Sequence, residues 1–406
     1  MKYRTQINYI LLLPFYTDKI INLIYFVKIK VNIKKMDLPE MESTMYPVND
    51  TNVKICAEKI ANGEIVVFPT ETVYGLGANS LDRKAVEQIY RVKKRPSNNP
   101  LIMHVLNWRG AKLYTLLNKS EEELVQTLVD NFWPGPLTIL VKKSDYVPSS
   151  VSSGTEWVSL RSPSNDIARK LLEYSMVPIV APSANMSGKI TSTHKEHIIK
   201  YFRNSRINML LDEEPTLLGV ESTILKIDNK ELVIVRPGVI TKDNIINCLN
   251  NKDKDKFKDI NISVAEIHEQ VEHPGSNISH YAPDKKTMLF NFIDTELGSE
   301  DKVDKSIAQS LNKSIDYYLT KCACVDFNGK NFHYRDKFGA YVDLSKDGDI
   351  NEALFNLYNV LHQLDKAPID NILIFDYWGE KDGLYSTMFD RVMRSCSGMR
   401  IMIPIS

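Results

Sequence analysis

The chain has 406 residues, a length that suggests two or three domains. Hydrophobic residues make up 43% and charged residues 25%, as in ordinary globular proteins, and a formal net charge of zero excludes a whole-molecule field that would steer a polyanion. Five dispersed cysteines include no Cys-x-x-Cys pair, which argues against a zinc ribbon or a disulfide framework and favours a reducing compartment.

Residues 1–35 are basic and apolar, with Asp18 as the sole acid. A lysine interrupts the apolar character, so a membrane span of ~20 residues does not fit. The composition favours a mitochondrial transit peptide, and an extension upstream of a start at Met36 or Met41 is an equal alternative. We therefore assign residues 1–47 to an N-terminal extension. We expect a cytoplasmic protein, with mitochondria as a second location.

A polar run directly after a strand best predicts a ligand site. Ile65–Phe68 is apolar and β-branched, as in a buried strand, and Pro69 ends it. The next five residues supply two hydroxyls, a carboxylate and a phenol, and Gly75 and Gly77 then permit a tight exit toward a helix from about Leu81. Open α/β sheets bind ligands at the carboxyl ends of strands, but a polar turn with hydroxyl caps fits this pattern equally well.

Apolar runs and amphipathic stretches follow one another up to residue 236. Helices are predicted near 53–63, 81–95, 120–132 and 165–174, with Ser120 as the N-cap of the third. Strands are predicted at 101–106, 137–141, 158–161, 177–181, 208–211, 223–227 and 232–236. Helices and strands interleave without strict βαβ regularity. The pattern therefore predicts an α/β fold with a twisted mixed sheet and helices packed on it.

The end of the chain predicts a second, smaller α/β domain. A charged run at 250–256 is expected to be a solvated loop. Apolar blocks then predict strands at 288–293, 323–327 and 372–375, and helical spacing predicts a helix at Ile350–Leu364. Cys322 and Cys324 lie in a strand-like block, where burial is the better interpretation than a metal pair.

Phe68–Gly77 resembles the most characteristic signature of the threonylcarbamoyl-AMP synthases, which are built on a YrdC-like domain. Further similar motifs follow in the family's order: Lys93–Arg95 with Asn99 and His104, Pro182–Gly188, Gly219–Ile224, Arg236–Gly238 and His280–Pro283. The last of these resembles the interdomain linker of the long-form members. The resemblance implies a YrdC-like catalytic domain over 48–265, a linker over 266–285 and a small Rossmann-like α/β domain over 286–406.

These motifs also have plain structural explanations. Cations at the end of a helix, as in Lys93–Arg95, complement its dipole, whereas clustered cations beside a strand end can hold an anion. Ser183 and Asn185 suit either an ordinary turn or a nucleotide site. Arg161 is a strand-end charge or, by the resemblance, a clamp for the threonine carboxylate. His104, alone before an apolar strand, would otherwise be structural.

The resemblance implies roles for individual positions. It implies that Lys93 and Arg95 are catalytic. Contacts to L-threonine are implied for Thr72, His104, Arg161, Ala181 and Ser222. Contacts to ATP are implied for Lys93, Arg95, Asn99, Ser183, Asn185, Thr191, Arg236 and Tyr281. Mg²⁺ is expected to arrive with ATP, without dedicated protein ligands.

Two segments depart from the family's pattern. Asp212–Pro215 reads Asp-Glu-Glu-Pro, where the family commonly has two glycines after the aspartate. Ser276–Ser279 replaces the linker's usual Met-Lys-Tyr-Arg. The lost lysine and arginine should weaken any phosphate contact from the linker, while Tyr281 is expected to contact the nucleotide as part of a lid.

The resemblance implies the activity of a nucleotidyltransferase. L-threonine and bicarbonate would give a carbamate, whose carboxylate attacks the α-phosphate of ATP, and threonylcarbamoyl-AMP and pyrophosphate would leave. The product would serve the threonylcarbamoyladenosine modification of tRNA beside the anticodon, through a partner transferase complex. Contact with tRNA is a further expectation, and contact with a membrane is not expected.

Two other functions stay open. A carbamoyltransferase of the hydrogenase-maturation type shares this domain, but it should bring cysteine-rich zinc motifs, which this sequence lacks. A non-catalytic RNA-binding module would need a basic groove without selectivity for threonine, and the zero net charge does not favour it.

Overall fold

The computed structural model describes residues 42–265, 280–294, 315–377 and 383–405. Most of the predicted N-terminal extension and of the predicted linker, with its departure at Ser276–Ser279, therefore lies outside the described residues. Within the described ranges, no helix is long and apolar enough to cross a membrane.

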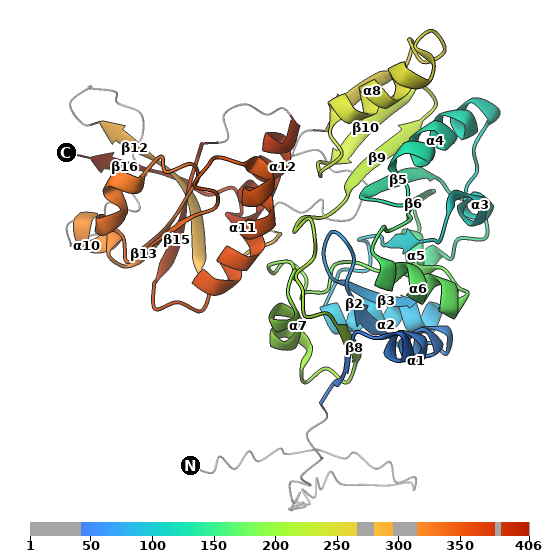
Figure 1. Ribbon diagram of the computed structural model, residues 1–406, viewed down its shortest axis with the longest axis horizontal. Coiled ribbons are helices and arrows are strands. Elements are labelled where there is room, and N and C mark those ends of the chain that lie inside the picture. Colours follow the sequence, from blue (N-terminus) through green and yellow to red (C-terminus); the bar gives the residue numbers. More distant parts are fainter. Residues whose placement is uncertain (1–41, 266–279, 295–314, 378–382, 406) are drawn as a thin grey trace, which may run out of the picture. The chain divides into compact units, whose positions relative to one another are not determined.

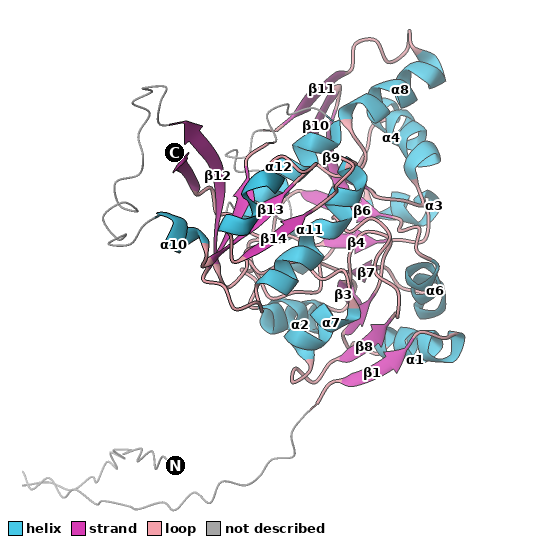
Figure 2. Cartoon of the chain, turned by 60° about the vertical axis from the view of Figure 1, so that its left-hand side comes forward, coloured by secondary structure: helices cyan, strands magenta, loops and turns pink. Residues whose placement is uncertain are grey.

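Eleven strands of the described chain form one large mixed sheet (Figure 1). Across the sheet their order is β1 (Thr44–Pro47), β8 (Asn208–Leu211), β2 (Val66–Phe68), β3 (Gly75–Asn79), β7 (Ile179–Val180), β4 (Ile102–His104), β6 (Trp157–Arg161), β5 (Leu137–Lys142), β9 (Thr223–Asp228), β10 (Glu231–Arg236) and β11 (Asn261–Val264). In Figure 2, the labelled strands of this sheet run from β11 at the top to β1 at the bottom in the same order. The sheet contains antiparallel pairs such as β2–β3 and parallel pairs such as β4–β6, so the predicted mixed sheet is confirmed.

Helices cover both faces of this sheet. Val66 and Phe68 of β2 face α1 (Asp50–Ala61) and α6 (Asp166–Ser175), whereas Val67 faces the larger core on the other side. That core is shared by α2 (Arg83–Lys93), α4 (Lys119–Phe132), α7 (Lys195–Phe202) and α8 (Lys242–Asp253). Shorter helical turns are α3 (Trp108–Ala111), the 3-10 turn Lys112–Tyr114 and α5 (Ser149–Ser152).

Five parallel strands form the second sheet, as predicted for a Rossmann-like domain. Their order is β14 (Ala340–Asp343), β13 (Cys322–Asp326), β15 (Asn371–Phe375), β12 (Lys286–Asp294) and β16 (Arg400–Ile405). The remaining elements are α10 (Ile315–Leu319), the 3-10 segment Phe332–Lys337, α11 (Ile350–Leu364) and α12 (Gly383–Ser395).

Strand β13 is buried on both of its faces. Ala323 and Val325 pack toward α11 and α12, and Cys322 and Cys324 pack toward α10. The predicted burial of the two cysteines is therefore confirmed. All five cysteines are buried and free.

The tight exit predicted at the signature is wrong, because Gly75–Asn79 forms strand β3, antiparallel to β2. A Cβ added to Gly77 would lie 2.5 Å from Cε1 of Phe68 and 2.9 Å from Cγ2 of Ile179. The glycine therefore serves close packing rather than a turn. Residues 70–74 form the loop of a hairpin, and α2 begins only after β3.

Besides β3, the pattern misses β1, β11, β14 and β16, and each of these four is an edge strand of its sheet. An edge strand is more exposed than a central strand, and β1, β11 and β14 accordingly contain only exposed or half-buried residues. Residues 44–47, predicted as part of the extension, belong to the sheet through β1.

Two helix ends also differ from the prediction. α4 is capped by Asn118, in a capping box with Glu121, and not by Ser120. α8 continues to Asp253, so the first part of the charged run at 250–256 is helical and not loop.

Parallel pairing of β4 and β6 brings their carboxyl ends together, with His104 opposite Arg161. β7 runs antiparallel to β4, and the amide of Ala181 donates to the carbonyl of Ile102 at 3.0 Å. Farther along the sheet, at the start of β9, Arg236 of β10 is paired with Ile224. The sheet therefore places His104, Arg161 and Arg236 at one end of these strands, and Ala181 lies beside the start of the short strand β4.

Candidate active site

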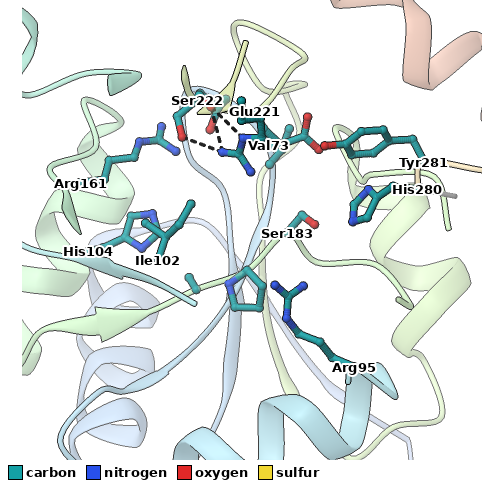
Figure 3. A pocket seen from close by; sticks show the side chains of 14 residues that line it. Val73, Arg95, Ile102, His104, Arg161, Ser183, Glu221, Ser222, His280 and Tyr281 are labelled. Atoms are coloured by element: carbon teal, nitrogen blue, oxygen red, sulfur yellow. Dashed lines mark hydrogen bonds between the residues drawn. The ribbon is translucent and has the colours of Figure 1, made fainter. Parts of the chain in front are cut away.

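One pocket lies along β4, beside the ends of β6 and β10, the start of β9 and the residues that follow β7 (Figure 3). It is lined by Thr72, Val73, Arg95, Ile102, His104, Arg161, Ala181, Pro182, Ser183, Glu221, Ser222, Arg236, His280 and Tyr281. Most of the predicted site residues are in this set. Segments that lie more than two hundred positions apart, at Thr72 and Tyr281, therefore meet at one cavity.

Four predicted residues do not line the pocket: Lys93, Asn99, Asn185 and Thr191. All four are buried, and each holds a residue or a loop that does line it.

Lys93 lies behind the pocket wall, with 1% of its surface exposed. Its ammonium donates to the carbonyl of Ser183 at 2.6 Å and also to the carbonyl of Asn185. The hydroxyl of Ser183 donates to Oδ1 of Asn185 at 2.6 Å. Burial, reinforced by the charge of Arg95, lowers the pKa of Lys93 well below its ordinary value. Lys93 and Asn185 therefore fix the loop that presents Ser183.

Arg95 reaches the pocket from beyond the end of α2 and is oriented by the segment after it. Its Nε donates to the carbonyl of Asn99 at 3.1 Å, and its Nη2 donates to the carbonyl of Pro100 at 2.9 Å and to Oδ1 of Asn99. Burial, with the nearby charge of Arg236, lowers the pKa of Arg95 to about 10, so the guanidinium stays charged at neutral pH. Asn99 therefore orients the Arg95 side chain and does not itself line the pocket.

The other end of the pocket combines a neutral imidazole with a paired guanidinium. Nη2 of Arg161 donates to Oε1 of Glu71 at 2.6 Å, and its Nε donates to the carbonyl of Gly135 at 3.3 Å. Burial acts to raise the pKa of Glu71, but the charge of Arg161 outweighs it and the net shift is downward. Burial lowers the pKa of His104 to about 3, so its ring is neutral at physiological pH. Its Nδ1 has no hydrogen-bond partner among the described residues.

Arg236 is held against the start of β9. Its Nε and Nη2 donate to the carbonyl of Ser222 at 3.0 and 2.9 Å, and Nη2 also lies 3.0 Å from the Ser222 hydroxyl. That hydroxyl is 2.8 Å from the hydroxyl of Thr138. Gly238 packs directly against the start of β9 and has no room for a side chain, because a Cβ there would lie 2.4 Å from the amide nitrogen of Thr223.

Five lining residues were not predicted as site residues, and two of them, Glu221 and His280, are ionisable; the others are Val73, Ile102 and Pro182. Glu221 accepts from the hydroxyl of Thr191 at 2.6 Å, which explains why Thr191 faces the carboxylate instead of the cavity. Burial lowers the pKa of His280 to about 3, and its ring meets that of Tyr281 edge to face at 4.1 Å between centroids. Glu221 and His280 each precede a predicted site residue, Ser222 and Tyr281, within a matched motif. That position in the sequence could have indicated that they line the site.

The pocket has the charge expected for an anion site. Arg95, Arg161 and Arg236 line it, against the single lining carboxylate of Glu221. Such guanidinium groups suit phosphate and carboxylate oxygens. Over the part of the chain that the structure describes, no group of three or more His, Cys, Asp or Glu side chains is arranged to hold a metal ion.

Family models match nearly the whole of the described chain. A model for Sua5, YciO and YrdC proteins, described as "Telomere recombination", matches residues 58–238. A second, described as "Threonylcarbamoyl-AMP synthase, C-terminal domain", matches residues 240–397.

Relatives named threonylcarbamoyl-AMP synthase share the length of the chain as well. The protein from Pyrococcus abyssi is 33% identical over 87% of this chain and 96% of its own length. The one from Bacillus subtilis is 39% identical over 86% of this chain and 94% of its own. The crystal structure of P. abyssi Sua5 complexed with L-threonine superposes with a TM-score of 0.71 at 30% identity, covering 90% of this chain and 99% of that one.

Proposed function

The chain belongs to the threonylcarbamoyl-AMP synthase family, and from that premise we propose that its pocket holds L-threonine and ATP side by side and joins them through bicarbonate. The family's enzymes make an adenylate, threonylcarbamoyl-AMP, and this chain carries that activity. The observation that carries the assignment of the site is the meeting of Thr72, Arg95, Arg161 and Arg236 at one cavity.

The proposed chemistry is a nucleotidyl transfer. The amine of threonine combines with bicarbonate to give a carbamate and water. A carbamate oxygen then attacks the α-phosphorus of ATP, a new P–O bond forms, and the bond to pyrophosphate breaks. No covalent enzyme intermediate is needed, because well-oriented reactants can gain roughly 7–11 kcal/mol from positioning alone.

We assign the end of the pocket at β4 and β6 to L-threonine. Arg161 supplies a positive charge for the substrate carboxylate, and its contacts with Glu71 and Gly135 hold its orientation. The neutral ring of His104 offers an unpartnered nitrogen to the polar groups of threonine. Thr72, Ala181 and Ser222 also line the pocket, and we assign their small side chains to this end.

We assign the end at Arg95, Ser183, Arg236 and Tyr281 to ATP. Two guanidinium groups can neutralise phosphate oxygens where charge grows during transfer. Lys93, Asn99 and Asn185 act behind the wall, since their polar groups are already bonded to Arg95 or to the Ser183 loop. Thr191 acts through Glu221.

We propose that Mg²⁺ enters with the triphosphate. Glu221, the carboxylate that lines the pocket, is already bonded to Thr191, Tyr358 and Arg391, so it is not free to serve as a metal ligand. Phosphate oxygens and water would hold the ion, which would add further positive charge against the phosphates.

The product would pass to a transferase that modifies tRNA beside the anticodon. Separate binding of that partner, and direct contact with tRNA, are proposals that rest on the product's chemistry. We propose the cytoplasm as the location of the protein, with mitochondria as a second location.

We also propose a catalytic domain over 48–265, extended at its start by strand β1, a linker over 266–285 and a C-terminal domain over 286–406.

The test is pyrophosphate release by the purified full-length chain with ATP and bicarbonate. We expect release with L-threonine, much less with serine, and none above background without an amino acid. Arg95→Ala should abolish release while the chain still folds, as a cooperative thermal melting transition would show. Turnover of Arg95→Ala at the unchanged rate, or release that ignores the amino acid, would refute the assignment. RNA binding without any pyrophosphate release would favour the non-catalytic module.

A further inference from the structure

A buried carboxylate at the edge of the pocket is paired with the second sheet's helices. Glu221 is 5% exposed and immediately precedes Ser222. One of its oxygens accepts from Thr191 at 2.6 Å. The other accepts from the hydroxyl of Tyr358, on α11, at 2.9 Å and from Nε of Arg391, on α12, at 2.9 Å.

Arg391 is fully buried and touches each segment that forms this side of the pocket. Its Nη2 donates to the carbonyl of Pro237, next to Arg236, at 2.9 Å. Its guanidinium carbon lies 5.2 Å from the ring centroid of Tyr281, and Asp390 binds Nη1. One guanidinium on α12 thereby contacts the neighbours of Ser222 and Arg236 and the ring of Tyr281.

Further contacts of α11 and α12 with residues 219–238 surround the pair of Glu221 and Arg391. The hydroxyl of Thr387 on α12 donates to the carbonyl of Gly238 at 2.8 Å. Gly219 has a φ of +68°, and a Cβ there would lie 2.6 Å from Cα of Phe355 on α11. Val220 shares a buried core with residues of α11 and α12.

Charge explains why this pairing matters to an anion site. Burial acts to raise the pKa of Glu221, but the charges of Arg391 and Arg236 outweigh it and lower the pKa to about 2. The carboxylate is therefore charged at neutral pH. A buried charge that loses its partner is strongly unfavourable, and here the unpaired anion would stand beside the groups assigned to phosphate.

We propose that Arg391 is a positioning residue of this enzyme, which neutralises Glu221 so that the wall of the pocket stays receptive to the phosphates of ATP. The C-terminal domain then completes the ATP site without touching the substrate. This inference rests on the proposed placing of ATP in the pocket.

The test uses the full-length chain and the equilibrium binding of a nonhydrolysable ATP analogue, measured by calorimetry. Arg391→Met should weaken binding about tenfold or more. The double variant Glu221→Gln with Arg391→Met should bind at least several-fold more tightly than the single variant, because it removes the stranded charge while Gln keeps the shape. Arg400→Met is the matched control, since Arg400 pairs with Asp376 elsewhere in the second domain, and its binding should be unchanged.

The dependence on pH separates this role from a merely structural one. The groups that face Glu221 or its partner are Thr191, Arg236, His280, Tyr281, Tyr358, Asp390 and Arg391. Without Arg391, burial should raise the pKa of Glu221, so binding by Arg391→Met should improve as pH falls from about 8 to about 6. The unchanged chain should not show that trend.

Three results would overturn the inference: unchanged analogue binding by Arg391→Met, a double variant that binds no better than the single, or a single variant whose binding does not improve at lower pH. Failure of the family reaction would show itself differently, as absence of pyrophosphate release by the unchanged chain. Analogue binding is measured without turnover, so the two failures are distinguishable.

Discussion

Ionisable side chains buried around the pocket take their charge state from partners far away in the sequence. Glu71 is held charged by Arg161, and Glu221 is held charged by Arg391. The sequence motifs predict the arginines at 95, 161 and 236, because resemblance marks them. They do not predict Glu221–Arg391, since nothing local to either residue signals a pair that is 170 positions apart.

Buried histidines should make the protein lose stability in mild acid. Burial lowers the pKa of His104, His280 and His362 to about 3 from an ordinary 6.5, and that of His197 to about 2. Below pH 6.5 the unfolded chain binds more protons than the folded one, so stability falls as pH falls toward 3, by up to about 1.4 kcal/mol per pH unit for each group.

The measurement is the free energy of unfolding by denaturant between pH 7.5 and about 5. His104→Gln should show a shallower fall than the unchanged chain, because the titration of His104 is gone. Glu221 and Glu71 have lowered pKa values, so both stay charged between pH 7.5 and about 5 and do not change the slope in this range. A fall of equal steepness in the variant would contradict the burial of a neutral His104.

Lys93 should be as important for stability as for activity. Lys93→Met leaves the carbonyls of Ser183 and Asn185 without their donor, which should cost about 1–3 kcal/mol in the free energy of unfolding and displace the Ser183 loop. The measurement is denaturant unfolding combined with pyrophosphate release. Lys94→Met, on the same turn, is the control and should leave stability within about 0.5 kcal/mol. Unchanged stability of Lys93→Met would contradict the buried role.

Among the elements, central strands could be predicted and edge strands could not. β5 and β6 are rich in apolar residues and almost entirely buried, and both were predicted within a residue of their ends. β3 was missed for a different reason. Its two glycines suggest a turn, but they are needed because Phe68 and Ile179 cover the strand. Packing that close is a tertiary feature that no local pattern shows.

Gly77→Ala should therefore destabilise the fold through crowding. The new methyl group would stand 2.5 Å from Phe68 and 2.9 Å from Ile179, which should cost about 1–3 kcal/mol. Gly110→Ala is the matched control, because its nearest neighbour, Asn107 Oδ1, lies 3.8 Å away. The measurement is the denaturation midpoint. Equal midpoints for the two variants would contradict the close contact at β3.

Taken together, the two sheets share a buried core that crosses between them. Ile190, Val220 and Tyr281 pack with residues of α11, α12 and the second sheet. The fold of each sheet could be predicted from its own segments, and the resemblance covers both. The contact that joins them could not, because it consists of long-range pairs whose members look like ordinary core or surface residues.

The shared core should make the two sheets unfold together. We expect calorimetry of the full-length chain to show one cooperative transition. Gly219→Ala should lower its midpoint or split it, since the residue needs a positive φ and has no room beside Phe355. Two separate transitions in the unchanged chain would contradict the shared core.

One cationic pocket should join threonine, bicarbonate and ATP. The most direct measurement supplies labelled bicarbonate with ATP and follows the label into an adenylate. The prediction is a labelled threonylcarbamoyl-AMP, formed one for one with pyrophosphate, that requires L-threonine and disappears in Arg95→Ala. ATP consumption without label in any adenylate, or labelling that does not need threonine, would contradict it.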